Sequence, residues 1–389
     1  MPGGYRARLV LFNENLGGHA AMHHALRAHL RRPGAWEVRF VDLPGPGRWR
    51  RLASARLPYL GARDLDFQTV RYRLAQSLHA RRLLQATLRP GDVLHAYTQS
   101  ALLCGADLLA CRPSVVATDA TIAQGVYHLP YRRPTRHTYL SARALRAREV
   151  RVYRAATLVV AQSRWAARSL SDAYGVGADR LRIVPYGLAD RPVPARALDR
   201  ERPAITFIGA TLGRKGGERL LRVVREHLPG RFVCHLVTRE AVEAGPDVVV
   251  HRDLSPGDPR LDGLLARSLA VVLPTEMDHS PYAVLEAMRA GVAVVATRSG
   301  AVHEMVVHDE TGLLVSHDDA ALAEALRTLV EHPERAEEMG RAGRRRFTRT
   351  YDAAATTAAL LTVCHEARER YRAAAAAGTP VAAGPAADR

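Results

Sequence analysis

Lysine is almost missing from this chain of 389 residues. Of its 56 basic residues only Lys215 is a lysine, and all the others are arginine. Whatever bias replaced lysine elsewhere spared this position. A compact ammonium group that donates to phosphate, without the planar fork of arginine, is a physical reason to need lysine there. We therefore treat Lys215 as a candidate phosphate ligand.

Cysteine is scarce as well. The four cysteines are Cys104, Cys111, Cys234 and Cys364, and no two of them have C-x-x-C spacing. This pattern predicts reduced, buried cysteines that act as small apolar residues. A disulfide framework and a structural zinc site are not expected.

Long apolar runs are also absent. No run approaches the length of a membrane span, and the first residues, Met-Pro-Gly-Gly-Tyr-Arg, do not contain the apolar stretch of a signal peptide. We therefore expect a cytoplasmic protein. An aromatic and basic module such as an RRM signature is missing too, so we expect no specific nucleic-acid partner.

Acidic residues are few in the first half of the chain only. Residues 1–190 hold 29 arginines and 12 acids (29 − 12 = +17), whereas residues 191–389 hold 27 basic and 27 acidic residues (27 − 27 = 0). A basic half favours an anionic partner such as a membrane leaflet or a phosphorylated acceptor. A coding bias toward arginine that leaves a merely solvated surface is an equally good explanation.

Within that half, arginines alternate with apolar residues between positions 44 and 60. The apolar members are Trp49, Leu52, Leu57, Tyr59 and Leu60. Such a pattern can lie on an anionic bilayer, with arginine stems reaching along the apolar layer. A plain loop of the N-terminal domain is the simpler interpretation.

The most informative stretch of the sequence lies between positions 274 and 297. An apolar run ends at Pro274, an acidic loop follows, and Ala283-Val284-Leu285-Glu286-Ala287-Met288 predicts a helix before a second apolar run. In such a strand, loop, helix, strand unit the loop lies at the carboxyl edge of a parallel sheet, where open α/β sheets bind ligands.

Two acids, Asp278 and Glu286, bracket this loop with seven residues between them. Carboxylates accept paired hydrogen bonds from sugar or ribose diols, and the first N–H groups of the helix suit a diphosphate between them. The alternative is that both acids only complement the helix dipole.

Two glycine-bearing loops follow predicted strands. Gly17-Gly18 comes after the first strand, and Gly209, Gly213, Gly216 and Gly217 surround Arg214-Lys215 after a strand that begins at Ala204. Glycines let backbone N–H groups approach a phosphate, and the two cations would neutralise it. Ordinary surface turns use the same residues.

The helix after Gly17-Gly18 carries His19 and His23 on one face. The glutamate of an H-E-x-x-H zinc site is absent, and we predict no metal site.

Together these segments resemble glycosyltransferase family 4, whose members are retaining enzymes. Asp278 to Glu286 is similar to the family's E-x7-E region, and Lys215-Gly216 to the end of its Gly-Arg-x4-Lys-Gly motif. Three further segments match in the same order along the chain: Gly17-Gly18, Pro185-Tyr186-Gly187 and Gly312-Leu313-Leu314-Val315.

The chain departs from the family pattern at four places. The first acid is Asp278 instead of glutamate, and His279-Ser280-Pro281 replaces Gly-Phe-Gly. The usual arginine of the glycine loop is Ala210, so Arg214 would supply the second cation. The histidine that ends a strand near position 117 is absent, which leaves Asp119 as the nearest polar candidate.

The resemblance implies a GT-B fold, in which two Rossmann-like α/β domains face each other across a cleft. Residues 1–190 would bind the acceptor, residues 191–203 would be a linker, and residues 204–351 would bind the nucleotide sugar. A helix over 352–375 would cross back to the N-terminal domain, and residues 376–389 would be a disordered tail.

The implied activity moves a sugar from a UDP- or GDP-linked donor to an acceptor hydroxyl without a metal or other cofactor. Lys215 and Arg214 would stabilise the diphosphate, Asp278 would bind the sugar hydroxyls and Glu286 the ribose. Further donor contacts are expected from one set of residues: Gly17, Gly18, Gly209, Gly216, His279, Ser280, Tyr282, Ala283, Val284 and Leu285. The acceptor is a sugar, a lipid-linked molecule or a small molecule, and peripheral contact with an anionic inner membrane face fits the basic half.

Two other functions use the same donor site. A nucleotide-sugar epimerase or hydrolase of the same fold would need no acceptor. A non-catalytic nucleotide-sugar sensor would result if the change to Asp278 had abolished turnover.

Overall fold

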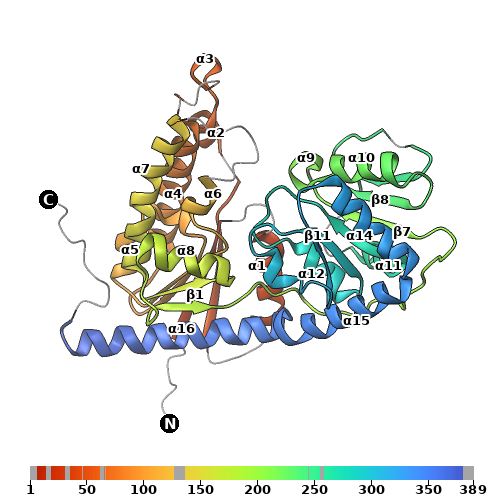
Figure 1. Cartoon of the computed structure of the whole chain (residues 1–389). Helices are drawn as coiled ribbons and strands as arrows, with labels where there is room; N and C mark the ends of the chain where they lie inside the picture. The colour runs from red at the N-terminus through yellow and green to blue at the C-terminus, as the bar shows by residue number, and fades with distance from the viewer. Residues whose placement is uncertain are drawn as a thin grey trace, which may run out of the picture. The chain divides into compact units, whose positions relative to one another are not determined.

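The computed structural model describes residues 7–14, 19–30, 36–45, 47–61, 65, 67–126, 136–243, 245–254 and 258–379. The chain divides into two compact units. Unit 1 consists of Met1–Pro185 and Thr356–Arg389, and unit 2 of Tyr186–Ala355. Each unit contains one six-stranded parallel sheet with helices around it (Figure 1). The predicted α/β class with two Rossmann-like halves is therefore confirmed.

The sheet of unit 1 has the strand order β2-β1-β3-β4-β5-β6, and every neighbouring pair is parallel. Its strands are β1 (Ala7–Asn13), β2 (Trp36–Asp42), β3 (Val93–Tyr97), β4 (Ser114–Thr118), β5 (Leu158–Ala161) and β6 (Leu181–Ile183). The chain leaves β1 in one direction for β2 and returns past it for β3, so the order reverses between β1 and β3.

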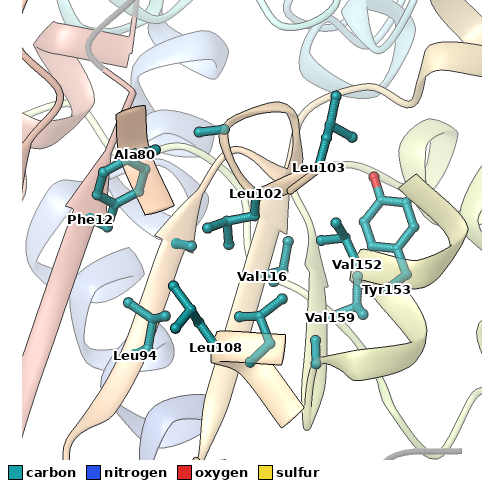
Figure 2. Packing of buried hydrophobic residues seen from close by; sticks show 14 of the residues in the cluster. Phe12, Ala80, Leu94, Leu102, Leu103, Leu108, Val116, Val152, Tyr153 and Val159 are labelled. Carbon is teal, nitrogen blue, oxygen red and sulfur yellow. The ribbon is translucent and has the colours of Figure 1, made fainter. Parts of the chain in front are cut away.

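Helices connect these strands and cover the sheet. They are α1 (His19–Leu30), α2 (Arg48–Ser54), α3 (Pro58–Gly61), α4 (Gln68–Thr87), α5 (Ala106–Ala110), α6 (Ile122–Val126), α7 (Arg136–Ala155), α8 (Arg164–Tyr174) and the 3-10 helix η1 (Gln99–Leu102). Figure 2 shows how Phe12, Leu94 and Val116 of the sheet pack with Val152 and Tyr153 of α7. Burial of this face holds α4, α7 and α8 on the sheet.

The sheet of unit 2 has the order β12-β11-β10-β7-β8-β9, again parallel throughout. Its strands are β7 (Ala204–Ile208), β8 (Val233–Val237), β9 (Val248–His251), β10 (Ser268–Leu273), β11 (Ala293–Thr297) and β12 (Gly312–Val315). Strands β10 and β11 are buried along their whole length. Their continuous apolar sequences are typical of parallel strands that are covered on both faces.

The helices of unit 2 are α9 (Leu212–Lys215), α10 (Gly217–His227), α11 (Pro259–Arg267), α12 (Tyr282–Arg289), α13 (Val302–Met305), α14 (Asp319–Glu331) and α15 (Pro333–Thr350). Sequence signals set several of their ends. The Asp258 and Asp318 side chains accept hydrogen bonds from the first turns of α11 and α14, and Gly291 follows α12 with a φ of +67°.

The last helix, α16 (Ala353–Ala376), begins in unit 2 and continues in unit 1. In unit 1 the ring of His365 lies 4.6 Å from the ring of Trp36 at the start of β2. Arg182 of β6 donates to the Glu366 carboxylate, with 2.9 Å between Arg182 Nε and Oε2. These contacts fix the unit 1 part of α16 to both edges of that sheet.

The structure differs from two expectations. The segment between positions 44 and 60 contains the short helices α2 and α3 instead of a plain loop. All four cysteines are free, but only Cys234 and Cys364 are buried, and Cys111 is exposed. Cys111 follows the five-residue helix α5 at a surface turn, where its apolar character does not bring it into the core.

Candidate active site

The candidate site lies in unit 2, where the strand order reverses between β7 and β10. Loops that leave the carboxyl ends of β7, β10 and β11 come together at this point. A reversal of strand order separates the loops of neighbouring strands and leaves a crevice for ligands at that edge.

The loop after β7 contains Gly216 and Lys215. Gly216 has a φ of +81°, and a Cβ atom there would meet the carbonyl oxygen of Pro274, so only glycine fits. This close approach brings Lys215, the last residue of α9, against the loop that follows β10. Lys215 Nζ donates to Asp278 Oδ2, and both side chains are largely buried. The structure therefore joins the only lysine to the first of the two predicted acids.

Arg214 ties the same two loops together. Its carbonyl oxygen accepts hydrogen bonds from Glu276 N at 3.2 Å and from Thr275 Oγ1 at 3.0 Å. Its Nη1 donates to Met277 O at 3.3 Å. Arg214 and Lys215 thus place two cations where the strand order reverses, and two cations suit the two phosphates of a diphosphate.

Asp278 and His279 are held from the other side by the loop after β11. Asp278 N donates to Ser299 Oγ at 3.1 Å, and Ala301 N donates to His279 O at 2.8 Å. Gly300 has a φ of +50°, and a Cβ there would meet the carbonyl oxygen of Asp278. The position of Asp278 is therefore fixed by β7, β10 and β11 together.

Helix α12 begins just after this loop. Its N-cap residue is Pro281, which gives it no side-chain cap, and the first backbone N–H groups of a helix have no acceptor within the helix. Glu286 lies on α12 and is only 1% exposed. Ala283, Val284 and Leu285 are buried, so that a donor would meet their backbone and not their side chains. The ring of Tyr282 lies 5.5 Å from the ring of Tyr186.

A buried ion pair anchors the other end of α12. Arg289 Nη2 donates to Asp262 Oδ1, and Arg191 Nε donates to Asp262 Oδ2 at 2.7 Å. Arg289 Nη1 also donates to Ala189 O at 3.4 Å. Burial lowers the pKa of Arg289, whereas the charge of Asp262 opposes this shift. Arg289 is one turn after Glu286, so the pair sets where the Glu286 turn lies.

One further acid lies at this edge. Glu240 follows β8, and its Oε2 accepts a hydrogen bond from Leu212 N at 2.9 Å, at the start of α9. Gly209 N donates to Val237 O at 3.0 Å, which closes the same corner. The β8 loop therefore shapes the glycine loop that carries Lys215.

Asp119 lies in unit 1, directly after β4. The loop that contains it is held by the buried Glu149 of α7. Gln99 Nε2 donates to Glu149 Oε1 at 2.8 Å, Ile122 N donates to Oε2 at 3.1 Å, and the Tyr174 hydroxyl donates to the same carboxylate. Burial raises the pKa of Glu149 against these hydrogen bonds. One carboxyl group thus organises two loops at the carboxyl edge of this sheet.

The structure brings together Lys215, Arg214, Gly216 and Asp278, with Ser280 and Glu286 on the same loop and helix. Gly17 and Gly18 lie outside the described residues. Among the residues that are described, no group of three or more His, Cys, Asp or Glu side chains is arranged to hold a metal ion. No helix in the described ranges is long and apolar enough to cross a membrane.

Sequence reasoning missed Ser299, Glu240, Asp262 and Arg289. Each acts through a contact between residues far apart in the chain, and a single polar residue gives no periodic signal. The run S-G-A at Ser299 was visible, but nothing in it pointed to Asp278.

Two family models match parts of this chain. The family model described as Glycosyltransferase Family 4 matches residues 16–190, and the model described as Glycosyl transferases group 1 matches residues 239–346. The alpha-maltose-1-phosphate synthase of Mycolicibacterium smegmatis is 29% identical over 171 residues, which are 38% of this chain and 44% of that protein. The chain spans between 22% and 62% of the length of eight curated relatives that it matches.

Solved structures share the fold. Sucrose-phosphate synthase from Thermosynechococcus elongatus has a TM-score of 0.67 at 17% sequence identity. The match covers 95% of this chain and 100% of the synthase chain. Anabaena HepE in complex with UDP and glucose has a TM-score of 0.64 at 16% identity and covers 92% of this chain and 100% of its own. The predicted two-domain glycosyltransferase fold, GT-B, is confirmed.

Proposed function

Because the chain belongs to glycosyltransferase family 4, we propose that it transfers a glycosyl group from a nucleoside diphosphate sugar to an acceptor hydroxyl. The observation that carries this proposal is that three charged side chains meet in unit 2 where the strand order reverses between β7 and β10. There the only lysine, Arg214 and Asp278 meet just ahead of the N-terminus of α12. Two cations, helix N–H groups and flanking carboxylates are the groups that a sugar diphosphate needs.

Each site residue has a distinct role in the proposal. Lys215 and Arg214 bind the diphosphate and stabilise its negative charge as it leaves, so that no divalent metal is needed for that step. Asp278 accepts hydrogen bonds from sugar hydroxyls, and Glu286 accepts them from the ribose.

The reaction keeps the configuration at the anomeric carbon. The bond between that carbon and the phosphate oxygen breaks, a bond to the acceptor oxygen forms, and the departing phosphate oxygen takes the acceptor proton. Exclusion of water protects the donor from hydrolysis.

The donor is proposed to be a UDP- or GDP-linked sugar. The structure of Anabaena HepE contains UDP and glucose, which favours the first for a protein of this fold. The acceptor is a sugar, a lipid-linked molecule or a small molecule. The cytoplasmic location stays a prediction.

A thermal-shift panel of UDP, GDP, ADP and dTDP without added metal tests the donor site. A ligand present at about a hundred times its dissociation constant adds about 2.7 kcal/mol of stability. We expect one nucleotide to raise the melting temperature of the wild type and Lys215→Ala to lose most of that response. Arg341→Ala, at an exposed position of α15, is the control and should keep it.

The outcomes separate the proposal from its rivals. If no nucleotide stabilises the protein, the donor site is wrong. If the sugar is released from the donor to water at the same rate with and without acceptors, the protein is a hydrolase, and if the product is an epimer still linked to the nucleotide, it is an epimerase. If the donor binds but is not consumed, the protein is a nucleotide-sugar sensor.

A further inference from the structure

A surface that the donor site does not use lies on α2 and α3 of unit 1. Among the described residues twelve large apolar side chains are exposed, and seven of them lie between Trp49 and Phe67. The three most exposed are Trp49 at 84%, Tyr59 at 71% and Leu52 at 66%. A concentration of this kind on so short a segment marks an interaction surface. We call it the α2–α3 surface, and its apolar members are Trp49, Leu52, Leu57, Tyr59 and Leu60.

The fold presents this surface in a defined way. Arg71 of α4 donates to Ala53 O and Ala55 O at the end of α2, both at 2.8 Å. Arg56 Nη2 donates to Gly61 O at 2.9 Å and so closes the turn into α3. Figure 1 shows α2 and α3 at the end of unit 1 where α4 begins. Helix α2 is therefore fixed to α4 and α3 to the turn that follows α2, while the apolar side chains of both helices are exposed.

The helical spacing of α2 separates its two faces. Arg50 and Ala53 are half-buried, whereas Trp49 and Leu52, three residues apart, are exposed together. Because Trp49 is exposed, burial of its side chain does not hold α2 in place.

The stretch that forms α2 and α3 is basic, whereas Asp64 and Asp66 follow it in the sequence. From Leu43 to Gly61 there are four arginines and no acidic residue. Arg48, Arg51 and Arg56 are exposed among the apolar side chains. Arginines with long stems beside tryptophan, tyrosine and leucine suit the boundary between lipid headgroups and acyl chains.

We propose that the α2–α3 surface docks unit 1 onto an anionic lipid bilayer. The arginines bind lipid phosphates, and Trp49, Leu52 and Tyr59 enter the headgroup layer. A protein partner would have to supply acidic and apolar groups in matching places, whereas an anionic bilayer supplies both over any area. An anionic bilayer is therefore the simplest partner for a surface that combines arginines with exposed apolar side chains.

The position of the surface adds a consequence that rests on the proposed function. The segment with α2 and α3 leaves the carboxyl end of β2, and the Asp119 loop leaves the carboxyl end of β4 in the same parallel sheet. The bilayer would thus meet unit 1 at the edge where an acceptor is expected. An acceptor embedded in the membrane surface follows from this arrangement.

Vesicle flotation of the full chain tests the docking independently of activity. The vesicles consist of phosphatidylcholine alone or of phosphatidylcholine mixed with phosphatidylglycerol. We expect the wild type to float with the anionic vesicles only. Binding should weaken as salt is added, because screening reduces the attraction between arginines and lipid phosphates.

Matched variants separate this surface from the general basic charge. Arg48→Ser with Arg51→Ser should weaken vesicle binding about 25-fold, since each arginine near an anionic bilayer contributes about fivefold. Arg341→Ser with Arg345→Ser, exposed arginines of α15, removes the same charge from unit 2 and should change little.

Trp49→Ser with Leu52→Ser should reduce binding about tenfold or more by removing apolar area. Leu78→Ser on α4, a residue that is 49% exposed outside the α2–α3 surface, is its control. The proposal is overturned if the wild type does not float, if it floats equally with neutral vesicles, or if both arginine pairs matter equally. Because nucleotide thermal shifts do not depend on lipid, failure here leaves the donor site proposal standing, and the reverse also holds.

Discussion

Burial lowers the pKa of two histidines of unit 1, His23 and His95. His23 Nδ1 lies 2.7 Å from Asp42 Oδ1, and burial lowers the pKa of His23 although Asp42 raises it. His95 of β3 is buried near His23, and burial lowers its pKa to about 3. Among the residues that the structure describes, neither Nε2 atom of these rings has a hydrogen-bond partner. Protonation of His95 would place an uncompensated charge in the interior, whereas His23 has Asp42 beside it.

Acidification should therefore destabilise the protein through His95. Its pKa is about 3 when folded and near 6.5 when unfolded, so between these pH values the unfolded chain binds a proton that the folded chain does not. The free energy of unfolding should fall as pH drops below about 6.5, by up to about 1.4 kcal/mol per pH unit for this group. Urea denaturation across this range measures the slope.

His95→Leu should flatten that slope by about one proton. His24→Leu, at an exposed position of α1, is the control and should leave it unchanged. An equal slope in the wild type and in His95→Leu would show that His95 is not the group responsible.

Lys215 and Asp278 show which site residues a sequence can reveal. Lys215 stood out because no other lysine exists, and Asp278 because seven residues separate it from Glu286 in a loop between a strand and a helix. Their mutual contact was not predicted, because it depends on Gly216 letting two loops touch. Ser299 was invisible for the same reason, since its hydrogen bond to Asp278 crosses 21 residues of chain.

Among the helices, α12 matters most for the site because it carries Glu286. Its C-terminal turn is tied to α11 by Arg289 and Asp262, whose side chains are 2% and 4% exposed. Arg191 also donates to Asp262, and this hydrogen bond holds the segment after Gly187 against α11. Such a buried pair contributes little net stability when intact, but a single remaining partner is an unpaired buried charge.

Asp262→Ala should therefore lower the free energy of unfolding of unit 2 by about 3–5 kcal/mol. Chemical denaturation with a fluorescence or circular dichroism readout measures this. Glu324→Ala breaks an exposed ion pair with Arg327 on α14 and is the control, with a small effect expected. If both variants lose a similar free energy of unfolding, burial of the pair between Arg289 and Asp262 does not determine the cost of breaking it.

Buried strands and long helices could be predicted from sequence, whereas the short helices α2 and α3 could not. Buried parallel strands such as β10 are continuous apolar runs, and α14 has an aspartate cap and a regular apolar face. By contrast, α2 has seven residues and α3 four, next to prolines and glycines that usually mark loops. Too few residues are present in them to show a helical period, and contact with α4 stabilises α2.

The whole chain consists of two units with separate sheets and separate cores. The described site residues that should bind the donor belong to unit 2, whereas the α2–α3 surface and the loop of Asp119 belong to unit 1. The chain passes between the units at Pro185–Tyr186 and within α16. Chains with more than one domain commonly unfold in more than one step.

We therefore expect two transitions in scanning calorimetry, of which a bound nucleoside diphosphate raises only one. Asp262→Ala assigns the unit 2 transition by lowering it, and Glu149→Ala assigns that of unit 1, because it leaves Gln99 and Ile122 N without their buried acceptor. The nucleotide that is active in the thermal-shift panel should raise the transition assigned to unit 2, and Lys215→Ala should abolish the shift. A rise confined to the unit 1 transition would move the donor site to the other sheet, and a single transition that rises as a whole would show that the two units unfold together.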